Sequence, residues 1–139
     1  MSSSVLYDNE EVARWIMEVI GTPYYGYRTA GLVRDGEIIA GILCDRFGIR
    51  ECQMHIATKE GSHWATRDNC AIAFGYVFNY LRRERVTVET PVSNTRMVRV
   101  NDHLGFMREG VKRCVTADGG DAIIFGMLKD ECRWLKEST

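Results

Sequence analysis

Apolar residues recur along the chain at two spacings, one typical of helices and one typical of strands. Between residues 8 and 20 they fall on one helical face, at Val12, Trp15, Ile16, Val19 and Ile20. Asp8 followed by Glu11 has the form of a capping box, so this helix is expected to begin at Asp8 and to stop at Gly21. Residues 1–7 are expected to form a loose end or a short edge strand.

Alternating patterns predict three consecutive strands after this helix. Residues 28–47 indicate a β-hairpin, because Asp35-Gly36 supplies the two positive-φ positions of a tight turn. Residues 48–58 predict a third strand whose two faces differ in chemistry. One face carries Glu51, Gln53 and His55, and the other carries Cys52, Met54 and Ile56.

The second half of the chain alternates between helices and strands. The expected elements are a helix over 70–85 with Thr66 as its N-cap, a strand over 86–90, a helix over 93–104 ending at Gly105, and strands over 111–118 and 121–130 joined across Gly119-Gly120. The resulting order, α-β-β-β-α-β-α-β-β, describes an α/β (α+β) fold with helices on both faces of one mixed sheet. Its central β-α-β unit requires at least one parallel pair of strands.

Composition restricts the class of protein. The 139 residues are 45% hydrophobic and carry a net charge of −1, which predicts one domain over 1–139 and argues against nucleic-acid or membrane partners. No apolar run approaches the roughly 20 residues that a membrane span needs, and the N-terminal residues lack the pattern of a secretory signal. The five cysteines include no CxxC pair, so we expect reduced core thiols, a cytoplasmic protein and no metal site.

The polar face of the strand over 48–58 is the first candidate for chemistry. Three polar side chains in a row on a central strand are costly to bury. Either this face points to solvent or hydrogen-bonding neighbours, or it forms the floor of a cleft. In a cleft, Glu51 or His55 would be suited to accept a proton near neutral pH.

The segment GSHWATRDN, residues 61–69, is the second candidate because it joins this strand to a helix. The first turn of a helix offers free backbone N–H groups and the positive end of its dipole, and both favour an anion. Arg67 adds a positive charge. Every helix start shares these properties, so local capping is an equally good interpretation of this segment alone.

The C-terminal half resembles a known family. RVTVETPVSNTRMVRVNDHLGFMREGVKR, followed by DGGDAIIFGMLKDE, is similar to the C-terminal half of the GNAT acyltransferases, in particular the branch that acetylates protein N-termini and small amines. The matching positions are Asn94, Arg99, Leu104-Gly105-Phe106, Glu109-Gly110, Arg113 and Asp121. Upstream, the order helix, hairpin, strand and helix also agrees. The resemblance implies a mostly antiparallel sheet with helices on both faces.

The resemblance also implies an activity and a cofactor. Such enzymes transfer an acetyl group from acetyl-CoA to a primary amine, and they bind the cofactor in a split between two parallel strands. By this resemblance Glu51 or His55 is the base, and Asn101 occupies the place where many members have a tyrosine acid; Tyr76 and His103 are alternative acids. The implied cofactor-binding residues are Met54, Ile56, Thr66, Arg67, Asp68, Asn69, Asn94 and Arg99.

The sequence departs from the family at the pyrophosphate turn. Gly61, Trp64 and Thr66 stand where the family has Arg or Gln, Gly, and Gly or Ala. The family's glycine lets the backbone approach the phosphates, and Trp64 would crowd them unless the turn takes another path. A second hypothesis is therefore a non-catalytic binding or assembly protein of the same fold, similar to some phage-encoded and virion-associated chains. The amine acceptor is open, and either a monomer or a homodimer is expected.

Overall fold

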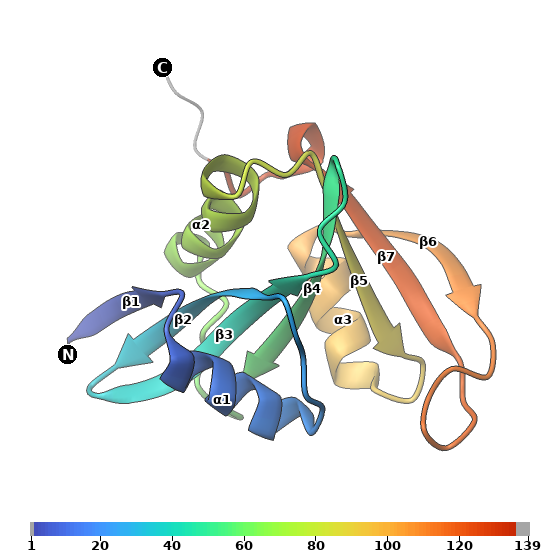
Figure 1. Ribbon diagram of the computed structural model, residues 1–139, viewed down its shortest axis with the longest axis horizontal. Coiled ribbons are helices and arrows are strands. Elements are labelled where there is room, and N and C mark those ends of the chain that lie inside the picture. Colours follow the sequence, from blue (N-terminus) through green and yellow to red (C-terminus); the bar gives the residue numbers. More distant parts are fainter. Residues whose placement is uncertain (1, 136–139) are drawn as a thin grey trace.

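The computed structural model describes residues 2–135 as a seven-stranded sheet with helices on both faces (Figure 1). The elements are β1 (Ser3–Tyr7), α1 (Glu10–Ile20), β2 (Arg28–Arg34), β3 (Glu37–Asp45), β4 (Glu51–Thr58), α2 (Arg67–Gly75), a π-helical turn (Tyr76–Tyr80), β5 (Arg85–Pro91), α3 (Thr95–Leu104), β6 (Met107–Lys112), β7 (Ala122–Leu128) and a 3-10 turn (Lys129–Glu131). The strand order is β1-β2-β3-β4-β5-β7-β6, and β4–β5 is the parallel pair. No helix among the described residues is long and apolar enough to span a membrane. The predicted fold class is confirmed, with β1 as an additional edge strand.

Helix α1 lies on one face of the sheet, and α2 and α3 lie on the other. Asn9 caps α1 through its side chain, which accepts from the amides of Glu11 and Val12, so the predicted cap at Asp8 is wrong by one residue. The close approach of α1 to the sheet depends on two glycines. A Cβ at Gly31 would lie 2.7 Å from the methyl groups of Val12, and one at Gly41 would lie 2.8 Å from Ile16.

The central hairpin and the polarity of β4 follow the sequence pattern. Asp35 and Gly36 both have positive φ, 50° and 81°, as a tight hairpin turn of this type requires. In β4, Cys52 and Met54 are buried on the α2 face, whereas Glu51 is exposed on the opposite face.

The second helical segment differs from the single helix expected over 70–85. Thr66 is its N-cap, as predicted, and accepts from the amide of Asn69 at 3.2 Å. The α-helix then widens into a π-helical turn from Tyr76 to Tyr80, in which the amide of Leu81 donates to the carbonyl of Tyr76. This turn stacks the rings of Tyr76 and Tyr80, with centroids 5.6 Å apart. The apolar spacing predicted helix, but it carried no signal for this change of pitch.

The last two strands also begin and end differently from the prediction. The first of them was expected over 111–118, yet β6 ends at Lys112 and residues 113–121 form a loop. Hydrogen bonds within the loop hold it in this shape. The amide of Val115 donates to the carbonyl of Gly120 at 2.8 Å, and the amide of Cys114 donates to the carboxylate of Asp121 at 3.0 Å. These amides are therefore engaged inside the loop, and the ladder with β7 stops at the pair Lys112–Ala122.

The cysteines agree with the prediction except at one position. All five are free, and Cys44, Cys52, Cys70 and Cys132 are buried, whereas Cys114 is exposed on the loop after β6. Burial raises the pKa of the Cys70 thiol to about 11, so this thiol stays protonated at neutral pH. Within residues 2–135, no three His, Cys, Asp or Glu side chains are grouped as metal ligands.

Asp8 links β1, β2 and the π-helical turn. Its carboxylate accepts from Arg28 at 2.8 and 2.9 Å, from the hydroxyl of Tyr76 at 2.6 Å, and from the amide of Thr29 at 3.3 Å. The hydrogen bond from Arg28 is the main reason that the pKa of Asp8 falls from 3.8 to about 2.

An Asp8→Asn variant tests this linkage. The folded-state pKa is depressed, so the stabilisation is fully present above the unfolded pKa near 4 and is lost as pH falls toward 2. Allowing for the partial exposure of Asp8, we expect the variant to lose about 1–2 kcal/mol of unfolding free energy at pH 7. In urea titrations, the difference from wild type should roughly halve between pH 7 and pH 3. A difference that is constant with pH would contradict this role.

Candidate functional site

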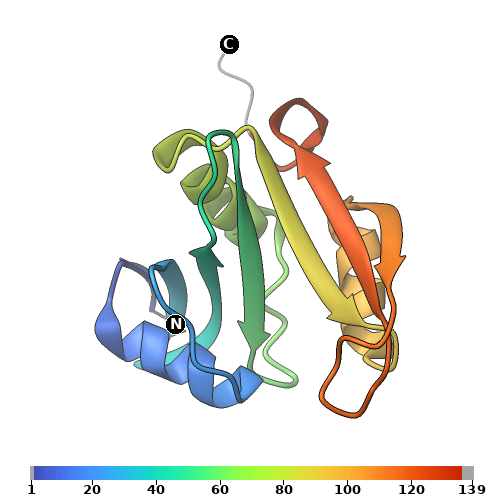
Figure 2. The ribbon, with the colours of Figure 1, turned by 45° about the vertical axis from the view of Figure 1, so that its right-hand side comes forward.

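A cleft opens where β4 and β5 separate. The two strands pair from Glu51–Arg85 to Gln53–Thr87 only, although they continue to Thr58 and Pro91. Figure 2 shows them side by side at their start and diverging toward their C-terminal ends. The cleft has a volume of about 560 Å³, and its lining comes from β4, β5, the end of α1, the start of α3 and the loop after β6.

The main chain of β4 presents unpaired groups to this cleft. The amide of Lys59 donates to the carbonyl of Ile39, so by alternation the odd-numbered residues of β4 direct their N–H and C=O groups toward β3. The main-chain groups of Ile56 and Thr58 therefore face the side on which β5 has moved away. Both residues line the cleft, as does Met54. The cleft wall is thus a strand edge that is suited to bind a ligand carrying amide groups.

His55 lies in this cleft with a buried partner behind it. Its Nε2 is 2.9 Å from the Oδ1 of Asp45, the last residue of β3. The His55 side chain is 22% exposed, whereas that of Asp45 is 8% exposed. Because a carboxylate accepts hydrogen bonds, Asp45 favours the tautomer with hydrogen on Nε2. Nδ1 of His55 is then the nitrogen that is free to accept a proton.

Tyr24 covers the imidazole of His55, with ring centroids 4.1 Å apart. It comes from the loop after α1, and it lines the cleft. Burial, reinforced by the nearby Asp45 carboxylate, raises the pKa of Tyr24. Tyr24 therefore remains a neutral phenol at physiological pH and restricts the space available to the imidazole.

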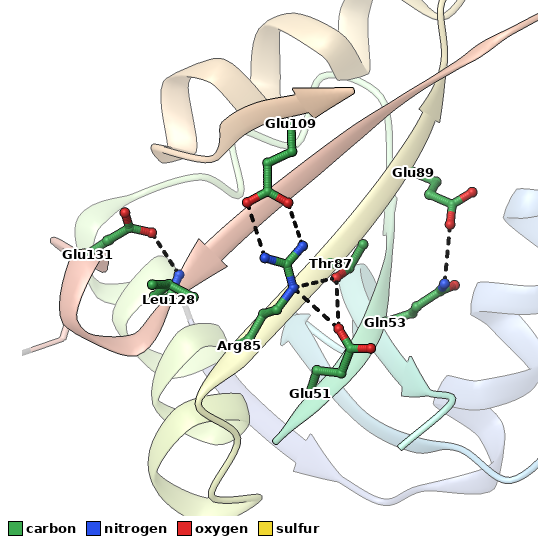
Figure 3. Close-up of polar contacts among 8 residues, drawn as sticks. All are labelled: Glu51, Gln53, Arg85, Thr87, Glu89, Glu109, Leu128 and Glu131. Atoms are coloured by element: carbon green, nitrogen blue, oxygen red, sulfur yellow. Dashed lines mark hydrogen bonds and ion pairs between the residues drawn. The ribbon is translucent and has the colours of Figure 1, made fainter. Parts of the chain in front are cut away.

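Glu51 and Gln53 share a face with His55, but each is bound to a different partner (Figure 3). Glu51 belongs to a network around Arg85, and Gln53 is bound to Glu89, which lines the cleft. Arg85 lies at the centre of the network that contains Glu51, with hydrogen bonds to Glu109 and to Thr87 and an ion pair with Glu51 at 3.3 Å. The hydrogen bond from Arg85 lowers the pKa of Glu109. Gln53 donates to Glu89 at 3.2 Å. The structure thus holds Glu51 where β4 and β5 are still paired, outside the cleft lining, and brings only His55 of this row into it.

Helix α3 contributes the opposite end of the cleft. Asn94 caps α3 by accepting from the amide of Met97, and it lines the cleft, as does Arg96. Arg96 donates to the hydroxyl of Thr58 at 3.3 Å and so spans the opening from α3 to β4. Arg99, the basic residue selected from the sequence, is exposed and lies outside the cleft lining.

Asn101 and the two alternative acids lie outside the cleft lining. Asn101 is fully buried and donates through Nδ2 to the hydroxyl of Thr90 at 2.8 Å, and its Oδ1 has no partner among the described residues. Tyr76 is bonded to Asp8, and burial is the main reason that its pKa is raised. His103 faces Trp134, with ring centroids 6.2 Å apart. The structure thus places none of these side chains near His55 in the cleft.

The turn before α2 takes a path that removes Trp64 from the helix start. The Trp64 side chain is 7% exposed and belongs to the core cluster, and its carbonyl accepts from Asn69 and from the amide of Thr66. Thr66, Arg67 and Asp68 are exposed. The amides of Arg67 and Asp68 have no hydrogen-bond partner within the described part of the chain. These amides and the Arg67 charge suit an anion, which Asp68 opposes.

Two residues of the site were missed by sequence reasoning. Asp45 ends an apolar strand and has no spacing relationship with His55, which is ten residues away. The antiparallel register places it diagonally across from His55, since Asp45 pairs with Gln53. Arg96 was visible as one of two arginines in the helix, and only its position around the helix axis distinguishes it from Arg99.

No protein-family model matches the sequence, and no curated protein matches it significantly. The fold, in contrast, matches solved structures. A mutant of the spermidine N-acetyltransferase SpeG from Vibrio cholerae aligns with a TM-score of 0.76 and 15% identity over 96% of each chain. A chimera of that enzyme and hSSAT gives 0.75 and 14% over 99% of this chain and 100% of its own. SpeG with manganese ions gives 0.72 and 16% over 91% and 92%. Such identities establish structure only, and the chain has the fold of the GNAT acyltransferases.

Proposed function

We propose that this protein is an acetyl-CoA-dependent N-acetyltransferase that acts on a primary amine. The observation that carries the proposal is the placement of His55, backed by the buried Asp45, in the cleft where β4 and β5 separate. A histidine oriented by a buried carboxylate is a common arrangement for proton transfer. The acetyltransferase fold of the neighbouring structures supports this proposal.

The residues around the cleft fit acetyl-CoA. The free main-chain edge at Ile56 and Thr58 would hold the amide-bearing arm, with Met54 beneath it and Asn94 and Arg96 at its side. The exposed amides of Arg67 and Asp68, with the Arg67 guanidinium and the Thr66 and Asn69 side chains near them, would receive the phosphates. In the family, glycines leave room for the phosphates at this turn. Here the same room is left because the Trp64 side chain points into the core.

Bound acetyl-CoA supplies an acetyl group activated as a thioester. His55 would accept a proton at Nδ1 from the incoming ammonium group, so that the neutral amine could attack the carbonyl carbon. The carbon–sulfur bond would then break, and CoA would leave as a thiolate that takes up the second proton of the acylated nitrogen. Asp45 stabilises the resulting imidazolium through Nε2. The main-chain N–H of Ile56 would be available to donate to the carbonyl oxygen of the bound donor. Tyr24 holds the imidazole in place and narrows access for water.

The non-catalytic alternative accounts less well for the cleft. A binding or assembly protein has no need for Asp45, whose buried carboxylate is costly unless it serves His55. Within the described residues, no observation points to a phage or virion role. Among amines, spermidine is the acceptor named for the neighbouring structures, and it is a reasonable first compound to test.

Cofactor binding can be tested with two arginine variants of the same helix. Isothermal titration with acetyl-CoA and with CoA should show binding by the wild-type protein. Arg96→Ala should weaken it about fivefold to tenfold, because Arg96 lines the cleft. Arg99→Ala, one helical turn further on and outside the lining, is the matched control and should bind normally. Absence of heat with millimolar ligand would contradict the proposed function.

A further inference from the structure

The two edges of the sheet differ in their protection against pairing. At one edge, β6 carries Arg108, Glu109 and Lys112, and a bulge lies between Arg108 and Gly110. Charges and bulges of this kind prevent an edge strand from pairing with another chain. At the other edge, β1 has the sequence SSVLY, with no charge and no proline, and its pairing with β2 is regular.

The unpaired main-chain groups of β1 can be assigned from its register. The amide of Asp8 donates to the carbonyl of Thr29, and the amide of Asp35 donates to the carbonyl of Ser2. Even-numbered residues therefore bond to β2, and the odd-numbered Ser3, Val5 and Tyr7 direct their N–H and C=O groups away from the sheet. Within residues 2–135, β1 pairs with no other strand on that side.

We propose that β1 pairs with β1 of a second copy of this chain, forming a continuous sheet across a two-fold axis. An antiparallel register centred on Val5 places Ser3 opposite Tyr7 of the second copy and aligns all three outward-facing residues. This register is self-complementary, which a closed two-fold interface requires. It also places the large ring of Tyr7 beside the small side chain of Ser3.

The groove next to β1 suits a second copy because its lining carries no charge that would repel the same lining of that copy. A groove of about 590 Å³ lies between β1 and α2, bordered by Tyr7, Ile72 and Tyr80, and all its lining side chains are uncharged. Tyr7 and Tyr80 are 52% and 66% exposed. The chain as a whole has 27% charged residues, whereas β1 and the groove beside it have none. This difference favours a surface that binds a second copy of the chain.

The full-length protein tests this proposal in sedimentation velocity experiments. We expect a species of twice the 15.9 kDa chain mass. Val5→Lys should weaken dimerisation by at least about tenfold, since two lysines would then face each other across the two-fold axis. Val111→Lys introduces the same charge on the opposite edge and should leave the dimer unchanged. A monomer at all concentrations, or a dimer lost only in Val111→Lys, would overturn the proposal.

A cross-link tests the register independently of the stability of the lysine variant. In a hydrogen-bonded antiparallel pair, opposite Cα atoms are about 5.5 Å apart, within the range of a disulfide. Val5→Cys, combined with Cys114→Ser to remove the exposed thiol, should form a covalent dimer on mild oxidation. Ser2→Cys in the same background should cross-link far less. Equal cross-linking of the two variants would show that β1 does not pair in this register.

Discussion

The His55→Gln variant should acetylate amines about 10²–10⁴-fold more slowly than the wild type, with acetyl-CoA affinity nearly unchanged. Glutamine keeps an N–H that can donate to Asp45, but it has no nitrogen that accepts a proton near neutral pH. The change therefore removes the proton acceptor while the cleft keeps its shape. Thiol release with saturating acceptor measures the rate, and calorimetric titration measures the affinity.

Two further variants identify the source of this loss. Asp45→Asn should lower the rate about tenfold or more, because the imidazolium loses its carboxylate partner. Glu51→Gln, the alternative base suggested by the sequence, should remain close to wild type, since Glu51 is paired with Arg85 outside the cleft lining. A large loss in Glu51→Gln with normal activity in His55→Gln would reverse the assignment.

The Phe74→Ala variant should lose about 3–5 kcal/mol of unfolding free energy. Phe74 is 2% exposed on α2, and its ring contacts Phe78 and Phe106, with centroids 6.3 and 5.9 Å away. It thereby joins α2 to the turn that follows α3. Removing the ring leaves a cavity between α2 and the turn after α3, and neither element can move in to fill it without losing its other contacts. Urea unfolding followed by circular dichroism gives the free energy and its slope.

An exposed aromatic residue provides the control for this loss. Tyr25→Ala removes a ring that is 82% exposed and should change stability by less than about 0.5 kcal/mol. Comparable losses in the two variants would mean that the packing around Phe74 is not the source of the stability. A lowered denaturant slope in Phe74→Ala would indicate a less compact native state, in which case the free energies cannot be compared directly.

The elements that are visible in the sequence are those specified by local patterns. The hairpin turn at Asp35-Gly36, the cap at Thr66 and the alternation along β4 each depend on neighbouring residues, and each is found as predicted. The predictions that failed concern positions where two neighbouring residues could play the same structural role. Asn9 and Asp8 are both good caps, and Asp8 is instead engaged by Arg28 from β2, which local sequence does not reveal.

The candidate site was only partly predictable for the same reason. His55 was identifiable because a polar residue on a central strand needs an explanation, but the choice between His55 and Glu51 depends on where β4 and β5 separate. That point is set by tertiary packing and not by either strand alone. Asp45 and Arg96 became recognisable only when the register of β3 with β4 and the rotation of α3 were known.

Because β4 and β5 pair over only three residues, the sheet consists of two parts with a short connection between them. One part, β1–β4, carries His55 and Asp45, and the other, β5–β7, carries the opposite wall of the cleft. A molecule lying between the two parts would take the place of a strand in the sheet. Recognition of such a molecule would use the same main-chain pairing that elsewhere holds the protein together.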